Sequence, residues 1–548
     1  MRASLRSLLC AAIAVITLTA CGQSDAPKTA GAPPDMRRLT EEQYRNTIAD
    51  VFGTSIKIGG RIDSLVRTNG LLELGARSAA ITPSGLEKFD QLARSIADQV
   101  VDPAHRDILI GCAPPIADAF DEYCVRQFFT RVGRMLYRRP LTKDELTARI
   151  NAASLASKNL ADFHQGVALS LAAMLVSPNF LFVIDTTEDD PDHAGQLRLD
   201  GYAKAARLSY FLWNSTPDDT LLTAAEKGDL ATASGRKREI ERMIASPRLE
   251  GGVRGFFADA LALDAFETLE KDSILFPAFN LAVAQDAREQ TLRTISAELI
   301  AREGDYRDLF TTRRSYMSAA LARVYRVYVP KTANWVPYEF AKNDPRVGIQ
   351  SQISFTALHS HPGRSSPTLR GKALRELLLC QKVPDPPGDV DFTKFNDPKS
   401  EIKTAREKLA LHTSQAACAG CHKLTDPLGL GLEQFDGAGQ HRTTENDVAI
   451  DVTGDLDGVK FKDPATLGAA IRANPAVPTC LVSRLYTYAV GRPAATDEQG
   501  LIAYLQKRFS DEGYKYPALL RAIASADAFY AVKPREQTPP QTAQESRP

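Results

Sequence analysis

Ala416-Ala417-Cys418-Ala419-Gly420-Cys421-His422 forms a Cys-x-x-Cys-His run late in a chain of 548 residues. Two thiols at this spacing can each add to a vinyl group of one haem, and the adjacent histidine is then placed to ligate the iron. A zinc site, a redox dithiol and a disulfide are the alternatives. Zinc would need two further ligands at matching spacing, and the sequence has no second Cys-x-x-Cys and no His-x(3–5)-His. A redox dithiol would need a βαβ context, whereas these surroundings are typical of loop and helix.

We therefore expect one covalent haem c, bound through Cys418 and Cys421, with His422 as the proximal iron ligand. The second axial ligand is less obvious, because small c-type cytochromes commonly use a downstream methionine and the last methionine here is Met317. A histidine, a distant methionine that folds back, a weaker group or water must take its place. His361 is the first candidate, and His412 and His441 follow. Each of these could instead be an ordinary surface histidine.

The N-terminus has the features of a secretory signal peptide. Arg2 and Arg6 precede an apolar run, Leu8 to Ala20, that is too short to span a membrane as a mature helix. The residues Leu18-Thr19-Ala20-Cys21 resemble a bacterial lipobox, in which the cysteine is acylated and becomes the first mature residue. Gly22 in place of Asp favours the outer membrane. We expect a lipoprotein of the bacterial envelope, facing the periplasm or the surface; an ordinary soluble secretion signal is the alternative.

Four cysteines remain after the signal peptide, the lipid site and the haem motif are set aside: Cys112, Cys124, Cys380 and Cys480. An even remainder in an oxidising compartment favours two disulfides. The local pair Cys112–Cys124 is the most economical of the three possible pairings, and it leaves Cys380–Cys480. Buried free thiols are the alternative. The second bond would close a loop that contains the haem motif.

Charge and hydropathy exclude several classes of protein. Lys plus Arg number 67 and Asp plus Glu also number 67, so no global basic field is available to attract nucleic acid. No apolar run after the signal peptide approaches the roughly 18 residues that a membrane span needs. No Gly-rich phosphate loop, nucleophile elbow or zinc-protease motif occurs. We expect no nucleic-acid partner and a redox partner protein in the envelope.

Helical patterns dominate the chain. Capping boxes predict helix starts at Thr40, Ser84, Thr142 and Thr496. The strong β signal is Asp457-Gly458, a tight-turn dipeptide between two short apolar runs. The fold class is therefore mainly α: a multi-domain helical protein with a C-terminal cytochrome c-like haem domain and a small β-hairpin. The predicted boundaries are 1–20 for a lipoprotein signal peptide, 21–35 for a tether, 36–103 for an N-terminal helical domain, 104–184 and 193–345 for two further helical domains, 346–445 for the haem-binding domain, 446–532 for a hairpin with helices, and 533–548 for a disordered tail.

Short motifs spread over nearly all of the mature chain carry a family resemblance. They are Arg38-Leu39-Thr40 with Tyr44, Asp50 and Gly53; Tyr137-Arg138-Arg139-Pro140-Leu141; Arg207 to Trp213 with Pro217-Asp218-Asp219; Ser366 to Gly371; Cys418 to His422; Asp426-Pro427-Leu428-Gly429; Glu433-x-Phe435-Asp436; and Tyr488 to Arg492. Jointly they resemble the planctomycete-type multi-domain cytochrome c-like proteins, secreted bacterial proteins built from consecutive domains of unknown function. The resemblance implies a periplasmic or surface haem protein, and it names no substrate.

The expected function is that of an envelope, lipid-anchored c-type cytochrome that transfers electrons to or within an oxidoreductase system. One alternative is a haem enzyme, peroxidase-like or substrate-oxidising, whose iron keeps an open position. Another is a surface binding module in which the haem is structural. Asp426, Glu433 and Asp436 could serve as acid–base carboxylates, but the favoured interpretation is that they are buried and cap turns around the haem. No catalytic residue is assigned.

Overall fold

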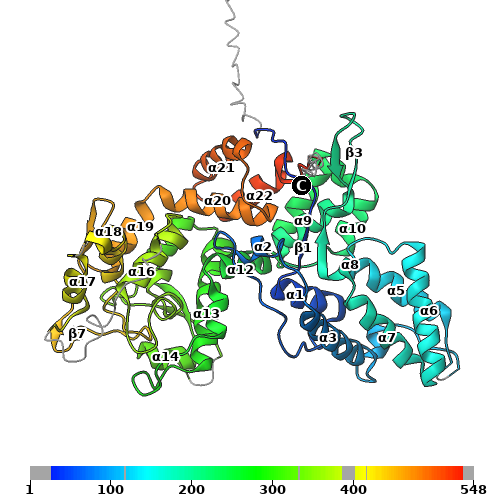
Figure 1. The fold of residues 1–548 in the computed structure, drawn as a ribbon, viewed down its shortest axis with the longest axis horizontal. Coiled ribbons are helices and arrows are strands. Elements are labelled where there is room, and N and C mark those ends of the chain that lie inside the picture. The colour runs from blue at the N-terminus through cyan, green and yellow to red at the C-terminus, as the bar shows by residue number, and fades with distance from the viewer. Residues whose placement is uncertain (1–25, 117–118, 331–333, 385–401, 415, 535–548) are drawn as a thin grey trace, which may run out of the picture.

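The described part of the chain is elongated and mostly helical. The computed structural model describes residues 26–116, 119–330, 334–384, 402–414 and 416–534. The predicted signal peptide, Cys21 and the tail from residue 535 lie outside these ranges. In Figure 1 the helices of 405–430 lie at one end of the long axis and those of 122–175 lie at the other.

Residues 36–184 form an N-terminal body around one hydrophobic core, so the segments predicted as 36–103 and 104–184 pack together. Its first and last strands pair antiparallel, with Arg37 opposite Val183, and this pairing closes the body on itself. Its elements are β1 (Met36–Arg38), α1 (Glu41–Phe52), α2 (Leu72–Gly75), α3 (Pro83–Val101), α4 (Arg106–Leu109), α5 (Glu122–Leu136), α6 (Lys143–Leu160), α7 (Phe163–Leu175), α8 (Pro178–Leu181) and β2 (Phe182–Ile184).

Residues 197–532 form a larger body around a second core, which also takes in Leu71 and Leu74 of the first segment. The strand β3 (Thr187–Asp189) precedes it and pairs with its first strand, β4 (Leu197–Leu199). Its first half continues with α9 (Gly201–Trp213), α10 (Asp219–Glu226), η1 (Asp229–Ala231), α11 (Ala233–Ile244), α12 (Leu249–Ala260), η2 (Leu263–Glu267), α13 (Leu281–Ser296), η3 (Ala297–Ala301), η4 (Tyr306–Phe310), β5 (Arg314–Met317), α14 (Ala319–Tyr325) and β6 (Val336–Glu339).

The second half of this body carries the haem motif and the C-terminal helices. It contains η5 (Ile349–Ser351), α15 (Ile353–Thr356), α16 (Pro367–Ala373), η6 (Leu374–Leu378), α17 (Ala405–Thr413), α18 (Ala416–Leu430), β7 (Thr444–Glu445), β8 (Val448–Ala449), β9 (Gly454–Leu456), β10 (Val459–Phe461), α19 (Pro464–Ala473), α20 (Ala476–Val490), η7 (Thr496–Glu498), α21 (Gln499–Asp511), α22 (Tyr516–Ser525) and η8 (Asp527–Phe529).

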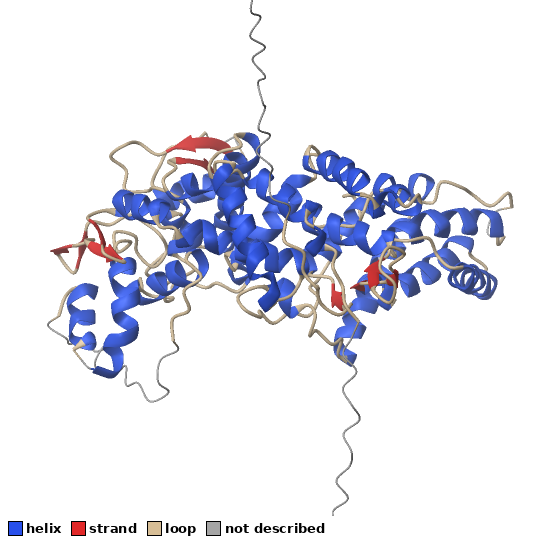
Figure 2. Cartoon of the chain, turned by 90° about the horizontal axis from the view of Figure 1, so that it is seen from above, coloured by secondary structure: helices blue, strands red, loops and turns tan. Residues whose placement is uncertain are grey.

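The strands form short two-stranded antiparallel pairs (Figure 2). The prediction of a mainly α, multi-domain protein is confirmed. The predicted hairpin is β9–β10, with Leu456 opposite Val459. Asp457 and Gly458 both have positive φ, at 52° and 93°, as a tight turn between twisted strands requires.

Local capping explains where the helices begin. Thr40 and Thr142 each accept a hydrogen bond from the backbone N–H three residues on, and the side chain at that position returns the contact, so both predicted capping boxes are confirmed. The box predicted at Ser84 is wrong, because Thr82 caps this helix instead. Pro83 suits the first helical position and moves the start of α3 earlier. The box predicted at Thr496 is replaced by η7, the short 3-10 turn that leads into α21.

The stretch predicted as a tether is attached to the body before it reaches β1. Ala32 forms a parallel bridge with Val532, and the N–H of Lys533 donates to the carbonyl of Ala32 at 3.1 Å. The N–H of Ala30 donates to the carboxylate of Asp497 at 3.1 Å. The two ends of the described chain therefore lie side by side on the C-terminal helices.

Two disulfides lie in the structure, and they are the pairs predicted from the sequence. Cys112–Cys124 joins the loop after α4 to the first turn of α5. Cys380–Cys480 joins the end of η6 to α20 across a separation of 100 residues. The second bond ties the helices around the haem motif to the C-terminal part of the chain.

Helices α16 and α18 cross at very close range because a glycine lies on each. A Cβ added at Gly371 would lie 1.8 Å from the carbonyl oxygen of Thr425, and one at Gly429 would lie 1.7 Å from that of Pro367. Only glycine lets two backbones approach this closely. The crossing explains in structural terms why the motifs at 366–371 and 426–429 each contain a glycine.

We expect Gly371→Ala to destabilise the protein by about 1–3 kcal/mol, because a methyl group must push α16 away from α18. The free energy of unfolding from denaturant titration measures this. Gly420→Ala is the matched control: Gly420 lies on the same helix α18, and a Cβ there meets nothing within 4 Å. Equal stability of the two variants would contradict the crossing as described.

Candidate haem site

The Cys-x-x-Cys-His motif lies on α18. Cys418 and Cys421 are three residues apart in a helix and His422 is four from Cys418, so the three side chains share one helix face. Both cysteines are free thiols and partly buried, whereas the other four cysteines of the described ranges are paired in disulfides. Two thiols and an imidazole on one face form the donor set that a covalent haem requires.

The ring of His422 is oriented by a carboxylate. Its Nδ1 lies 2.8 Å from Oδ2 of Asp426, one helical turn on. A carboxylate only accepts hydrogen bonds, so Nδ1 carries the proton and Nε2 is the nitrogen that would meet iron. Asp426 is itself buried and accepts a hydrogen bond from Thr368 of α16 at 2.9 Å. Metal-bound histidines are usually oriented in this way by a hydrogen bond to the second ring nitrogen.

A fully buried arginine holds the chain that follows α18 against α16. Arg370 donates to the backbone carbonyls of Leu432, Phe435 and Asp436 at 2.9, 2.7 and 2.6 Å. Its guanidinium also lies 3.3 Å from the carboxylate of Glu433. Burial lowers the pKa of Arg370 to about 10, so the side chain stays charged at neutral pH.

Glu433 and Asp436 have structural roles, which agrees with the favoured interpretation of these carboxylates. Glu433 accepts hydrogen bonds from Ser365 and Arg442 at 2.8 and 2.9 Å in addition to its contact with Arg370. The Oδ1 atom of Asp436 accepts from the backbone N–H groups of residues 438 and 440, both at 2.9 Å. Both carboxylates are therefore engaged in holding the segment after α18.

The candidate sixth ligands lie in different places. The carbonyl of His361 accepts a hydrogen bond from Lys271 at 3.1 Å, and burial lowers the pKa of its imidazole, so the ring is neutral at pH 7. The ring centroids of His441 and Phe435 lie 6.4 Å apart. Burial and the positive charge of Arg346 lower the pKa of the His441 imidazole. His412 belongs to α17, which packs along α18; its side chain lies outside the described residues. The assignment of the sixth ligand stays a prediction.

The two methionines considered as distant ligands are fully buried in the second core. Met243 lies in α11, where its backbone carbonyl accepts a hydrogen bond from Trp213, and Met317 ends β5. Both side chains contribute to hydrophobic packing. Neither could serve an iron on α18 without disrupting that core.

Two features near the motif escaped the sequence analysis. Thr368 completes the chain of hydrogen bonds to His422, but a single threonine on another helix carries no sequence signal. His359 is buried beside Phe355, with ring centroids 4.8 Å apart, and burial lowers the pKa of its imidazole to about 3. Its place in an apolar stretch, two residues before His361, was the available clue.

Five family models match the chain in succession, each described as a protein of unknown function. They are DUF1587 over residues 37–102, DUF1595 over 124–185, DUF1592 over 199–327, DUF1588 over 346–445 and DUF1585 over 457–529. This consecutive arrangement is that of the planctomycete-type multi-domain family. The chain belongs to that family. No curated protein and no solved structure matches the chain.

Helices α16 and α18, Arg370 and the residues that Arg370 contacts all lie within the DUF1588 domain. The hairpin β9–β10 begins just before the DUF1585 domain, which also holds Cys480. The Cys380–Cys480 bond therefore joins these two domains. Among the residues described for this family member, no helix has the length and apolar character needed to cross a bilayer.

We expect Asp426→Asn to leave haem attachment intact and to raise the reduction potential by about 60–120 mV. The carboxylate beside Nδ1 of His422 stabilises ferric iron more than ferrous iron, so the neutral amide should weaken binding of the ferric state selectively. A selective loss of about 10–100-fold, the usual effect of removing such a partner, corresponds to about 60–120 mV for one electron. Spectroelectrochemical titration measures it.

Asp451→Asn is the matched control, because Asp451 is a largely exposed carboxylate of the same region. Thr368→Val should shift the potential in the same direction by less, since it removes only a neutral hydrogen bond to Asp426. An unchanged potential in Asp426→Asn would show that this carboxylate does not act on the iron.

Proposed function

We propose that the chain is a c-type cytochrome of the bacterial envelope with one covalent haem, which transfers electrons to or within an oxidoreductase system. The observation that carries the proposal is the shared face of Cys418, Cys421 and His422 on α18, with the ring of His422 held by Asp426. A bound haem would supply a one-electron redox centre. The chain itself supplies the two cysteines, the histidine and the carboxylate that orients the histidine.

Each residue of the motif has a distinct task under this proposal. Cys418 and Cys421 would bind the haem through thioethers, and His422 would bind its iron through Nε2. Asp426 would keep the proton on Nδ1 and fix the plane of the ring. The glycine crossing and the Arg370 contacts would hold these groups in place while the charge on the iron changes.

We also propose that the protein is anchored to a membrane, most simply the outer membrane, by a lipid on Cys21. The support is the lipobox-like sequence at 18–21, which follows a positive and then an apolar stretch. A partner protein that supplies or accepts electrons would meet the cytochrome in the same compartment.

A haem enzyme with an open iron position is the second candidate, and the carboxylate on His422 favours it. A carboxylate at Nδ1 makes the imidazole a stronger electron donor, which favours the higher oxidation states that oxidative chemistry uses. A high-spin ferric spectrum with ready cyanide binding would support the enzyme. A low-spin spectrum that depends on His361 would support electron transfer with bis-histidine ligation.

When wild-type protein is matured in a periplasm with a cytochrome c maturation system, we expect it to stain for haem on a denaturing gel. Cys418→Ala or Cys421→Ala should weaken the stain, and the double variant should abolish it, because no thioether can then form. The control is a chain with Cys112 and Cys124 both changed to Ser, which removes a remote disulfide and should stain fully. Wild-type protein without stain would refute the proposal.

Cys21→Ser should move the protein from the membrane fraction to the soluble fraction, because the lipid would be its anchor. Immunoblots of fractionated cells measure the distribution. Cys10→Ser, inside the signal peptide, is the matched control and should leave the protein at the membrane. Unchanged membrane association of the Cys21→Ser variant would rule out lipidation at this site as the anchor.

A further inference from the structure

A cavity of about 470 Å³ lies where the DUF1587, DUF1592 and DUF1585 domains meet, remote in sequence from the haem motif. This volume falls within the range of about 300–1,000 Å³ typical of small-molecule sites, which often lie between domains. Arg61, Glu267 and Leu281 line it and are each more than half exposed, so they mark its mouth. Tyr488 of α20 and the Gly255–Asp259 turn of α12 line its interior.

Two buried polar side chains in this cavity have no hydrogen-bond partner among the described residues. Asn214 is 2% exposed and Tyr488 is 5% exposed, yet neither the amide of Asn214 nor the hydroxyl of Tyr488 is hydrogen-bonded there. Polar groups on the wall of an open cavity form hydrogen bonds with water or with a ligand, so both are available to a ligand that enters this cavity. Burial and the nearby carboxylates of Glu73 and Asp259 raise the pKa of Tyr488 far above its usual value, so its hydroxyl stays protonated.

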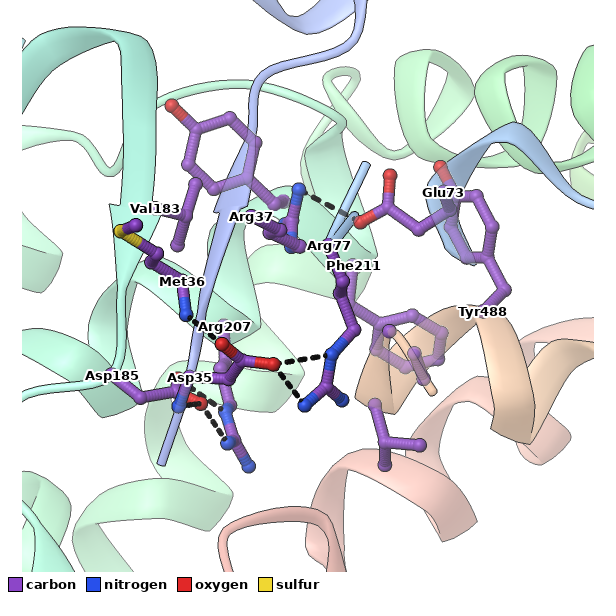
Figure 3. A pocket seen from close by; sticks show the side chains of 14 residues that line it. Asp35, Met36, Arg37, Glu73, Arg77, Val183, Asp185, Arg207, Phe211 and Tyr488 are labelled. Atoms are coloured by element: carbon purple, nitrogen blue, oxygen red, sulfur yellow. Dashed lines mark hydrogen bonds and ion pairs between the residues drawn. The ribbon is translucent and has the colours of Figure 1, made fainter. Parts of the chain in front are cut away.

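Most of the cavity's carboxylates are already neutralised. Figure 3 shows Glu73 between Arg37 and Tyr488 in a smaller adjoining pocket, and Arg37 lies 2.8 Å from Glu73. Asp259 pairs with Arg67 at 2.7 Å and accepts two backbone hydrogen bonds. These two carboxylates belong to the framework of the domain junction.

Glu42 is the cavity carboxylate that its arginine partner holds least closely. It lies in the first turn of α1, its side chain is 39% exposed toward the cavity, and its nearest cation, Arg288, is 3.6 Å away, beyond hydrogen-bond distance. Burial raises the pKa of Glu42; Arg288 and Arg254 oppose the effect, and Asp259 adds to it. A ligand with a positive charge would add to the incomplete compensation that these arginines give the carboxylate.

The shape and charge of the lining restrict the class of ligand that the cavity could bind. Leu72, Phe266 and Leu281 provide apolar surface. Six acidic side chains and three arginines line the cavity, and Arg37 and Arg67 pair with three of the six carboxylates from outside the lining. Within the described ranges no group of three or more His, Cys, Asp or Glu side chains is arranged to hold a metal ion. An ammonium group has three N–H donors. The cavity offers it the carboxylate of Glu42, which forms an ion pair with Arg288 at 3.6 Å but accepts no hydrogen bond from it, and the hydroxyl oxygen of Tyr488 and the amide oxygen of Asn214.

We propose that this cavity binds a small organic cation, with its ammonium group held by Glu42, Tyr488 and Asn214 and its apolar body against Leu72, Phe266 and Leu281. The site is independent of the haem site, since no residue that lines it belongs to the DUF1588 domain. It gives the junction of the other domains a ligand-binding role in addition to its structural one.

The test uses benzylamine as the cationic probe, with benzyl alcohol and benzoate as its neutral and anionic counterparts of similar shape. Isothermal titration calorimetry on the whole mature chain should detect benzylamine binding and much weaker binding of the other two. Glu42→Gln should weaken benzylamine binding about 10- to 100-fold, because it removes a charged acceptor without changing the shape of the side chain. Tyr488→Phe should weaken it about 2- to 10-fold.

Glu122→Gln is the matched control, because Glu122 is an exposed carboxylate of α5 that pairs with Arg126 outside the cavity. Circular dichroism and thermal unfolding establish that each variant is folded. The double variant of Cys418 and Cys421 should bind benzylamine as wild type does, which separates this site from the proposed haem. Absence of benzylamine binding, equal binding of benzyl alcohol, or wild-type affinity in Glu42→Gln would each overturn the proposal.

Discussion

The haem-motif helix depends on one buried guanidinium. Arg370 enters the protein interior from α16 and donates hydrogen bonds to three backbone carbonyls in the segment after α18, so its charge is compensated by carbonyl dipoles and by Glu433. Breaking such a buried pair typically costs about 3–5 kcal/mol, a large share of the stability of any domain. The glycine crossing brings α16 and α18 together, and this arginine keeps the crossing from sliding. Thr368, on the same short helix, then reaches Asp426 and through it His422.

Local signals predicted the local structure well. Helix starts at Thr40 and Thr142, the turn at Asp457-Gly458 and the helical fold class all follow from short-range physics. The start of α3 was misplaced because a proline competes with a serine for the start of the same helix. Long-range organisation was less predictable. The pairing of β1 with β2 joins residues far apart in the chain, and three-residue strands carry too weak a period-two pattern to be recognised.

The candidate site likewise has residues that could be predicted from the sequence and contacts that could not. Cys418, Cys421 and His422 are contiguous in sequence and could be recognised as a set. Asp426 is one helical turn from His422, so its carboxylate was noticed, but its contact with Nδ1 depends on a rotamer that the sequence does not encode. The sequence does not reveal the cavity at the domain junction, because Glu42, Asn214 and Tyr488 come from three domains and no motif joins them. Tyr488 was part of a family motif, yet its chemistry became apparent only from its neighbours.

The attachment of residues 30–32 to the C-terminal part of the chain limits the length of the linker between Cys21 and the folded protein. If a lipid on Cys21 holds the chain, only about ten residues separate the bilayer from this docking point. Fully extended, they reach about 35 Å, so the C-terminal domain must stay within roughly its own diameter of the membrane surface. In Figure 1, α18 lies toward one end of the long axis, away from that attachment point. Rotation of the protein about its anchor would therefore move the proposed redox centre over the membrane surface. A partner embedded in or lying on the same bilayer would thus be met by lateral diffusion within the membrane together with rotation about the lipid anchor.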